Sequence, residues 1–485
     1  MQEYDVLIVG AGLSGIGAAY HLRRQCPGCS FHILEAREQI GGTWDLFRYP
    51  GIRSDSDMYT LGYEFKPWLG GKVLADGPAI REYVCETAEE NDILPRISFG
   101  LNVQSADWSS ADKRWTLTAD ANGEQREFRC RLLLTCAGYY RYDQGYMPEY
   151  PGGERFKGEL FHPQHWPEDL DYTGKRVVVI GSGATAVTLV PAMADDVASM
   201  TMLQRSPTYF APGENRNELA DSLRELEIPE EWVHEIVRRR ILKDSQEITR
   251  RSFEEPEALK AELLEGARAF LGDQFDIEKH FTPSYRPWQQ RLAFIPDGDM
   301  FQAIAAGKAS VVTDHIDRFV PEGVRLTSGE VLKADIIVTA TGFNLCVLGD
   351  INFRVDGRPV DFADTVTYRG MMFTGVPNLV WVFGYFRASW TLRADLISEF
   401  VVRLLQRMDQ DGHRQVTPAL RDSDSNMPHL PWIDPDNFNP GYLMRSMHLM
   451  PKQGDHAPWV FTQDYWKEKD EIPAADLDDG ALQYG

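Results

Sequence analysis

The chain has 485 residues of ordinary globular composition: 43% are hydrophobic and 25% are charged, which excludes wholesale disorder. Acidic residues outnumber basic ones 73 to 50, for a net charge of −23, so we expect no nucleic-acid partner. No apolar run reaches the ~20 residues that span a bilayer, and the N-terminus lacks the basic start of a signal peptide. With only six cysteines, this pattern predicts a cytoplasmic protein without a stable membrane anchor.

The first 35 residues predict a βαβ unit. Residues 4–9 (YDVLIV) form an apolar run, residues 10–15 (GAGLSG) a glycine turn, residues 16–24 a helix, and residues 31–34 a second strand that ends at Glu35. In such a unit the backbone N–H groups at the start of the helix bind a pyrophosphate. The glycines expected to permit this contact are Gly10, Gly12 and Gly15.

The same pattern returns in the middle of the chain. Residues 115–119 and 131–136 first predict two strands with a turn at Asn122-Gly123. Then residues 176–180 (RVVVI) predict a buried strand, and a second glycine turn and helix follow, with the next strand at 200–203. The expected phosphate contacts of this second turn are Gly181, Ser182, Gly183, Ala184, Thr185 and Ala186.

A helical region follows. Residues 216–272 are rich in Glu, Arg and Leu, with helical spacing, and predict an insertion that extends with its flanks over about 212–290. Residues 334–343 (ADIIVTATGF) and 379–383 then predict strands, and residues 396–408 a helix. The fold class is therefore α/β, with two doubly wound Rossmann-like dinucleotide-binding domains and a helical insertion.

The residues at the end of the second strand differ between the two units. Glu35 can accept hydrogen bonds from a ribose diol, which suits an unphosphorylated adenosine such as that of FAD. The second unit has Arg205 and Ser206 at this place, which can neutralise and hydrogen-bond a 2′-phosphate. We therefore expect FAD at the first site, NADPH at the second, and hydride transfer between them.

Three further segments resemble one family. Residues 41–55 contain GGTW, RYPG and Asp55, as in class B flavoprotein monooxygenases. Residues 156–167 (FKGELFHPQHWP) resemble the F-x-G-x-x-x-H-x-x-x-W-P fingerprint of Baeyer–Villiger monooxygenases, and residues 340–342 resemble the family's A-T-G strand end. Within the family, RYPGIRSDSDMYTLGYEF and HFTPSYRPWQQRL most resemble the ethionamide-activating subgroup.

The resemblance implies a reaction and two catalytic residues. NADPH reduces FAD, dioxygen adds at flavin C4a, and the resulting peroxyflavin attacks a ketone to give an ester or lactone; related members oxidise sulfides and thioamides. The family's catalytic arginine maps onto Arg291, which would supply a fixed positive charge, with Arg286 as its nearest rival. Asp55 maps onto the carboxylate expected to hold that arginine near the flavin.

The resemblance also implies the domain boundaries and further cofactor contacts. The FAD-binding domain would cover residues 1–145 and resume over 326–485, with the NADP-binding domain at 146–325. Arg53 and Ser54 would face NADP, and His162 would be a hinge residue rather than a base. Gln290 stands where many members have a phosphate-binding lysine, which weakens the expected NADPH preference. The implied FAD contacts are Ser14, Gly42, Thr43, Trp44, Asp45, Leu46, Asp55 and Val103.

Three other functions are compatible with parts of this pattern. An N- or S-oxygenase without ketone activity shares both nucleotide sites, although such enzymes usually lack the Trp166-Pro167 ending. A flavin disulfide reductase would use Cys26 and Cys29, but this pair lies after the first helix, on the far side from the phosphate turn. A non-catalytic flavin sensor would not need Arg291 and Asp55. No second cysteine pair supports a metal site.

Overall fold

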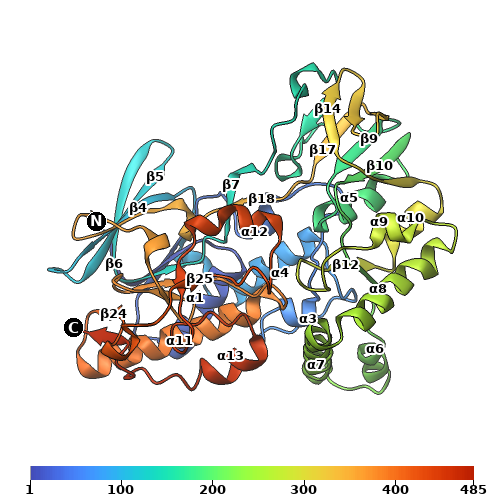
Figure 1. Cartoon of the computed structure of the whole chain (residues 1–485). Coiled ribbons are helices and arrows are strands. Elements are labelled where there is room, and N and C mark those ends of the chain that lie inside the picture. Colours follow the sequence, from blue (N-terminus) through green and yellow to red (C-terminus); the bar gives the residue numbers. More distant parts are fainter. Residues whose placement is uncertain (1) are drawn as a thin grey trace.

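The computed structural model describes residues 2–485 and contains two main β-sheets (Figure 1). In the larger sheet, β1 pairs in parallel with β2 and β6, and β4, β5 and β6 form an antiparallel meander. The meander turns at Asn122 and Gly123, whose positive φ angles suit a tight hairpin, as predicted. Its nine strands are, in spatial order, β20 (Arg358–Pro359), β19 (Asn352–Val355), β4 (Asn102–Ser109), β5 (Arg114–Ala121), β6 (Glu124–Thr135), β1 (Gln2–Val9), β2 (Phe31–Leu34) and β3 (Ile97–Ser98), with β23 (Leu379–Trp381) also paired to β6.

Three helices pack against one face of this sheet. They are α1 (Leu13–Gln25), α4 (Gly77–Glu90) and α11 (Trp390–Asp411). Their apolar side chains join Val6 and Ile8 of β1 in one buried cluster. Helix α11 extends the predicted segment 396–408 in both directions and ends at Gly412, which adopts the left-handed conformation common after helices.

The second sheet has five strands, all parallel. Their order is β13 (Ala309–Thr313), β10 (Ser199–Gln204), β9 (Arg176–Ile180), β17 (Ile336–Thr339) and β8 (Glu159–Phe161). The chain therefore returns to the first sheet after β17, not near residue 325 as expected, because β17 fills the position between β9 and β8. Helices α5 (Ala184–Met193) and α10 (Asp299–Ala305) accompany this sheet.

The helical insertion lies where the composition predicted it. Its helices are α6 (Glu218–Glu225), α7 (Glu230–Glu254), α8 (Pro256–Leu271) and α9 (Ile277–Phe281), between the paired strands β11 (Phe210–Gly213) and β12 (Ala293–Pro296). Helix α7 contacts α3 (Met58–Leu61) of the first half, and the buried Arg238 donates hydrogen bonds to the carbonyl oxygens of Tyr59 (2.6 Å) and Gly62 (3.3 Å). The insertion is therefore fixed to the first nucleotide unit.

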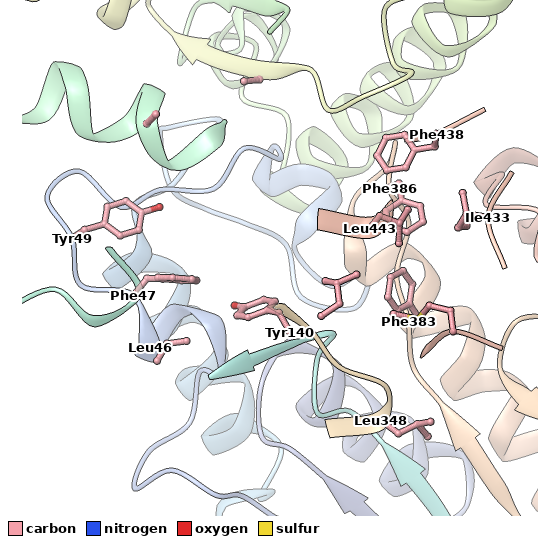
Figure 2. Close-up of a cluster of buried hydrophobic side chains, with 14 of the residues drawn as sticks. Leu46, Phe47, Tyr49, Tyr140, Leu348, Phe383, Phe386, Ile433, Phe438 and Leu443 are labelled. Carbon is pink, nitrogen blue, oxygen red and sulfur yellow. The ribbon is translucent and has the colours of Figure 1, made fainter. Parts of the chain in front are cut away.

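Two chain crossings join the halves of the molecule. β7 (Tyr140–Gly145) leaves the first half, β18 (Phe343–Leu345) returns to it, and the two strands pair antiparallel, as Figure 1 shows near the centre. Aromatic side chains pack beside this crossing. Figure 2 shows Phe47 and Tyr140 on one side of the cluster, and Phe383, Phe386 and Phe438 on the other.

The remaining elements are short. Within residues 2–485, none of the helices combines the length and apolar character that crossing a bilayer requires. The short strands and helices are α2 (Thr43–Leu46), β14 (Ile316–Val320), β15 (Gly323–Leu326), β16 (Val331–Lys333), β21 (Thr367–Tyr368), β22 (Met372–Phe373), β24 (Val416–Pro418), β25 (Leu430–Pro431), α12 (Gly441–Ser446), β26 (Lys452–Gln453), α13 (Tyr465–Glu471) and β27 (Leu482–Tyr484).

Candidate active site

The first glycine turn has the geometry of a pyrophosphate site. Gly10 adopts φ +103°, and a Cβ there would lie 2.5 Å from the Cys136 carbonyl oxygen. A Cβ on Gly15 would lie 1.9 Å from the Gly10 carbonyl oxygen, so only glycine lets α1 pack against β1. Gly12 caps α1 without a side-chain acceptor for the first N–H groups. The positive end of this helix is therefore available to an anion.

Glu35 lies at the end of β2, beside this turn. Its side chain is 5% exposed and accepts hydrogen bonds from the backbone N–H groups of Ala11 (2.6 Å) and Arg37 (2.8 Å). Burial raises the pKa of Glu35, and the two N–H donors oppose this shift. The carboxylate thus stands next to the phosphate turn, where an adenosine ribose would be held.

The second glycine turn repeats this arrangement. Gly181 adopts φ +129°, and a Cβ there would lie 2.2 Å from the Ala340 carbonyl oxygen. Gly183 caps α5 without a side-chain acceptor, and Ala186 in the first turn of α5 is fully buried. The hydroxyl of Ser182 bonds to that of Thr208 at 2.9 Å, which ties the turn to the loop after β10.

Arg205 and Ser206 lie in that loop and are exposed. Arg445 of α12 also lies near it: its guanidinium stacks on Tyr146 at 3.5 Å from the ring centroid. Burial and the neighbouring charge of Arg205 both lower the pKa of Arg445. Neither arginine forms an ion pair with any residue from 2 to 485, so both positive charges lack a carboxylate partner there.

Arg291 and Asp55 form an ion pair across the two halves. Both Nε (2.7 Å) and Nη2 (2.6 Å) of Arg291 donate to Oδ2 of Asp55. The pair is partly enclosed, with 36% of the arginine side chain and 23% of the aspartate side chain exposed. Burial lowers the pKa of Arg291, but Asp55 and the nearby tyrosines outweigh it, so the net shift is upward. The guanidinium therefore keeps its proton at any working pH.

Tyr139 and Tyr442 surround this pair, and sequence reasoning missed both. Burial raises the pKa of each phenol, and the charge of Arg291 partly offsets the shift. Tyr139 stacks on Trp390 at 5.2 Å, and Trp390 Nε1 donates to Ser14 Oγ of the first turn at 2.7 Å. These aromatic residues connect the first nucleotide unit to Arg291. No local motif marks them, since three distant segments bring them together.

The GGTW segment lies against the first turn. Thr43 Oγ1 bonds to the Tyr140 hydroxyl at 2.7 Å, and Gly42 adopts φ +56° close to Gly12. The buried carboxylate of Asp45 is engaged by Arg37 and Arg81, and its carbonyl oxygen accepts a hydrogen bond from Arg37 Nη2 at 3.2 Å, so the predicted contact of Asp45 with FAD stays a prediction. The neighbouring predicted contacts are apolar: Leu46 and Val103 are buried, and Trp44 is half-buried.

Arg53 and Ser54 make contacts within the protein. Arg53 forms an ion pair with Asp299 at the start of α10, with Nη1–Oδ2 at 2.5 Å, and this pair joins the two halves. The hydroxyl of Ser54 is buried and donates to the Ser56 carbonyl oxygen at 2.8 Å. Their expected contact with NADP stays a prediction.

His162 joins the linker to the A-T-G segment. Its Nδ1 accepts from the Gln164 N–H (3.1 Å), so Nε2 carries the proton and donates to the Gly342 carbonyl oxygen (3.0 Å). Burial lowers the pKa of His162 to about 4. The ring is therefore neutral at physiological pH, and both of its nitrogen atoms are occupied, which suits a structural hinge residue.

Cys26 and Cys29 form a disulfide, with Cα atoms 5.5 Å apart. The pair lies in the loop that follows α1, as the sequence predicted, and this loop contains a disulfide. The short loop after α1 brings the two sulfurs together. The disulfide lies at the C-terminal end of α1, whereas the glycine turn lies at its N-terminal end. It is thus separated from the first nucleotide site by the full length of the helix.

Comparisons with known protein families agree with this geometry. A flavin-binding monooxygenase-like family model matches residues 74–210, and an NAD(P)-binding Rossmann-like domain matches residues 8–66. The FAD-containing monooxygenase EthA of Mycolicibacterium smegmatis is 48% identical over 484 residues, which cover 100% of this chain and 97% of the relative.

Solved structures share the fold. The OTEMO complex with FAD and NADP superposes with a TM-score of 0.76 at 22% identity, covering 99% of each chain. A cyclohexanone monooxygenase bound to ε-caprolactone superposes with a TM-score of 0.70 at 20% identity, covering 86% of this chain and 90% of the other. The two nucleotide units, with the helical insertion in the second, therefore form a known architecture.

Proposed function

Because the chain belongs to the family of FAD-containing monooxygenases, we propose that it is an NADPH-dependent Baeyer–Villiger monooxygenase that inserts an oxygen atom beside a ketone carbonyl. The balanced reaction takes a ketone, O2, NADPH and a proton to an ester or lactone, NADP+ and water. The observation that carries this proposal is the Arg291–Asp55 ion pair, which joins the half that carries the first glycine turn to the half that carries the second.

The residues present fit both nucleotides. Gly10, Gly12 and Gly15 leave room where a Cβ would meet backbone, and Glu35 presents a carboxylate beside them, as an FAD adenosine requires. Gly181 and Gly183 would hold the NADP pyrophosphate in the same way. When bound, FAD supplies the redox centre that NADPH reduces and that activates dioxygen.

Arg291 would act by charge. Its Nε and Nη2 point at Asp55, and no hydrogen bond joins its Nη1 to an acceptor within residues 2–485, so Nη1 is free to meet a developing negative charge. The ion pair fixes the guanidinium before the substrate arrives, which lowers the cost of reorganisation. A preorganised donor of this kind contributes about 3–4 kcal/mol to the transition state.

Tyr139, Tyr442 and Trp390 would exclude water around that charge. The charge of Arg291 opposes the burial that raises the pKa of Tyr139 and Tyr442, and Trp390 stacks on Tyr139. In such surroundings an electrostatic interaction is stronger than in water. This enclosure favours oxygen transfer to substrate over loss of the activated oxygen as peroxide.

Arg205, Ser206 and Arg445 would select NADPH over NADH. The two arginines share the end of the second unit without an acidic partner among residues 2–485, and a 2′-phosphate would neutralise both. Arg445 would thereby replace the positive charge that Gln290 does not provide. Gln290 instead donates a hydrogen bond to Asn439 Oδ1 at 3.3 Å.

The ketone assignment has its own support. The cyclohexanone monooxygenase of the same fold was captured with ε-caprolactone, which is cyclohexanone plus one inserted oxygen atom. The segment 156–167 carries the fingerprint of such enzymes, and its His162 lies at the domain crossing as a neutral structural residue. If the enzyme accepted only sulfides or amines, the fingerprint and the likeness to the lactone-bound structure would have no explanation.

The test supplies the FAD-loaded protein with NADPH, ¹⁸O2 and a panel of linear ketones, cyclic ketones and sulfides. We expect esters or lactones that carry one ¹⁸O atom, with NADPH consumed in equal amount. Sulfoxides without any ester would establish the N/S-oxygenase alternative. NADPH-dependent reduction of a disulfide substrate that requires Cys26 and Cys29 would establish a reductase.

A further inference from the structure

Two arginines meet on one loop near the candidate site. Arg286 Nη2 donates to the Asn437 carbonyl oxygen at 2.9 Å, and Arg387 Nη2 donates to the same oxygen at 2.7 Å and to Asn437 Oδ1 at 2.6 Å. Both guanidinium groups also stack on the ring of Phe253, at 4.1 and 5.2 Å from its centroid. A shared acceptor and a shared ring place the two cations side by side.

Neither cation has an acidic partner. Among residues 2–485, no carboxylate lies within 4.0 Å of Arg286 or Arg387, although the chain has 73 acidic residues. Asp464 influences Arg387 from further away, and its carboxylate caps α13 by accepting from the Lys467 N–H. Burial and the neighbouring Arg286 lower the pKa of Arg387 to about 10. An anion bound between them would relieve this repulsion.

Apolar groups line the same place. The Arg387 guanidinium also lies 5.3 Å from the ring centroid of Phe438, which belongs to the aromatic cluster in Figure 2. The Nε1 atom of Trp288 is buried there without an acceptor among residues 2–485, and its carbonyl oxygen accepts from Arg387 Nε at 3.1 Å. Trp288 adopts φ +60°, a conformation that costs energy in a bulky residue. The cluster thus holds two guanidinium groups without a carboxylate partner and, among residues 2–485, a buried indole N–H without an acceptor.

Two segments of the chain connect this cluster to the candidate active site. Arg286 and Trp288 precede Arg291 on one segment, and Arg387 precedes Trp390, which contacts Ser14 of the first turn. We propose that Arg286 and Arg387 form an anion subsite that binds the carboxylate of an amphiphilic substrate, with its chain along the exposed ring of Phe253. The inference rests on the proposed function in one respect, because it takes the ketone substrate to be a keto acid.

The first experiment measures binding without turnover. Octanoate and methyl octanoate are titrated into the FAD-loaded protein by calorimetry. We expect octanoate to bind at least about tenfold more tightly, since only its carboxylate can accept charge-assisted hydrogen bonds from the two guanidinium groups. Arg286→Gln and Arg387→Gln should each remove this difference, and Arg286→Lys should restore part of it. The matched control is Arg239→Gln, an exposed arginine on α7 that pairs with Glu235.

Two results would overturn the subsite: equal affinity for octanoate and its ester, or unchanged octanoate affinity in both glutamine variants. If Arg387→Gln does not fold, Arg286→Gln decides alone, because its side chain forms fewer contacts.

The second experiment distinguishes the source of the anion. The KM values for NADPH, for a medium-chain keto acid and for its methyl ester are measured in the same variants. We expect the keto-acid KM to rise about tenfold or more, with the other two unchanged. A rise confined to the NADPH KM would assign the arginines to a nucleotide phosphate and overturn the proposal. If no ketone is oxidised but octanoate binding still depends on Arg286, the ketone assignment fails and the subsite stands.

Discussion

At the scale of single residues, the geometry of Arg291 divides its donors between two tasks. Nε and Nη2 both point at one oxygen of Asp55, which fixes the plane of the guanidinium. Nη1 lies on the other side and forms no hydrogen bond with residues 2–485. A lysine at this position could not divide its function in this way, since its charge rests on a single atom.

Replacing Arg291 with alanine should uncouple the reaction. FAD should stay bound, because the glycine turn and Glu35 do not contact Arg291. Product formation should fall about 10²–10³-fold, the loss expected for one preorganised donor, while NADPH oxidation yields hydrogen peroxide. The measurement compares product, peroxide and NADPH consumed. Asp55→Asn should show a smaller loss in the same direction, and full ketone turnover by Arg291→Ala would refute its role.

Arg205→Ala should change nucleotide preference. Loss of one charge-assisted contact to the 2′-phosphate should raise the KM for NADPH about tenfold or more and leave the KM for NADH nearly unchanged. Arg445→Gln should act in the same direction. Steady-state kinetics with both nucleotides checks this result, and equal effects on NADPH and NADH would remove Arg205 from the phosphate site.

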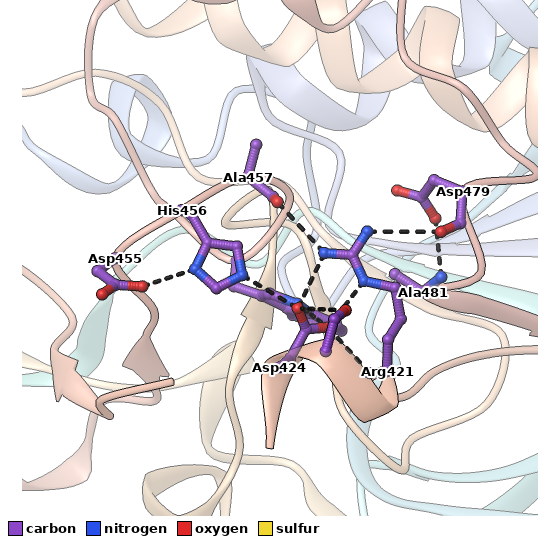
Figure 3. A network of polar contacts seen from close by, with 9 residues as sticks. Arg421, Asp424, Asp455, His456, Ala457, Asp479 and Ala481 are labelled. Atoms are coloured by element: carbon purple, nitrogen blue, oxygen red, sulfur yellow. Dashed lines mark hydrogen bonds and ion pairs between the residues drawn. The ribbon is translucent and has the colours of Figure 1, made fainter. Parts of the chain in front are cut away.

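At the scale of elements, a network of polar contacts links separate parts of the C-terminal segment (Figure 3). Asp424, almost fully buried, accepts from Arg421 Nε (2.8 Å), from Trp459 Nε1 (2.9 Å) and from His456 Nε2 (3.0 Å). Arg421 is the first cause that lowers the pKa of Asp424, and His456 adds to it. The network joins the short helical turn at Asp422–Asp424 to the loop that precedes α13.

This network predicts how stability depends on pH. Hydrogen bonds to Asp424 and Asp455 raise the pKa of His456 above its ordinary value of 6.5. The folded state therefore holds this proton more tightly than the unfolded state, so the stabilisation is full below pH 6.5 and is lost as the pH rises through the folded pKa. The melting temperature of His456→Gln should thus fall further below wild type at pH 5.5 than at pH 8.5. His448→Gln, which replaces an exposed histidine, is the control, and an equal deficit at both pH values would contradict the prediction.

The elements that carry the glycine turns could be predicted from sequence, because their information is local. Gly10, Gly15 and Gly181 each stand where a Cβ would meet backbone, and β-branched runs precede them. The place of β17 could not be predicted in this way, since its neighbours β8 and β9 lie far away in the chain. Tertiary packing alone brings three other residues to the site, Tyr442, Arg445 and Arg387. No motif in their own segments predicts this.

At the scale of the whole molecule, ion pairs, hydrogen bonds and a shared hydrophobic cluster join the two halves of the chain. The Arg53–Asp299 ion pair is one of them, and both side chains are less than a third exposed. Arg238 in the insertion contributes two hydrogen bonds to the first half. Such contacts can set how the two nucleotide units face each other, which hydride transfer requires.

Asp299→Asn should loosen this arrangement. It leaves the half-buried Arg53 without its counter-charge, which should lower the free energy of unfolding by about 1–3 kcal/mol. Thermal unfolding with bound FAD would measure the change. Asp195→Asn is the control, because its pair with Lys308 is on the surface of the second half and should matter little. Equal shifts for the two variants would show that the Arg53–Asp299 pair does not stabilise the junction.

The pairing of β7 with β18 also bears on how such a chain could have been assembled. Gly145 stands opposite Phe343 in this antiparallel pair, so the points where the polypeptide departs and comes back are adjacent. A short reverse turn between them would make a plain hairpin and leave the nine strands of the larger sheet in place. The second nucleotide unit therefore occupies the position of an enlarged hairpin loop. A gene for one cofactor-binding module could acquire a second module at this insertion site without disturbing the first.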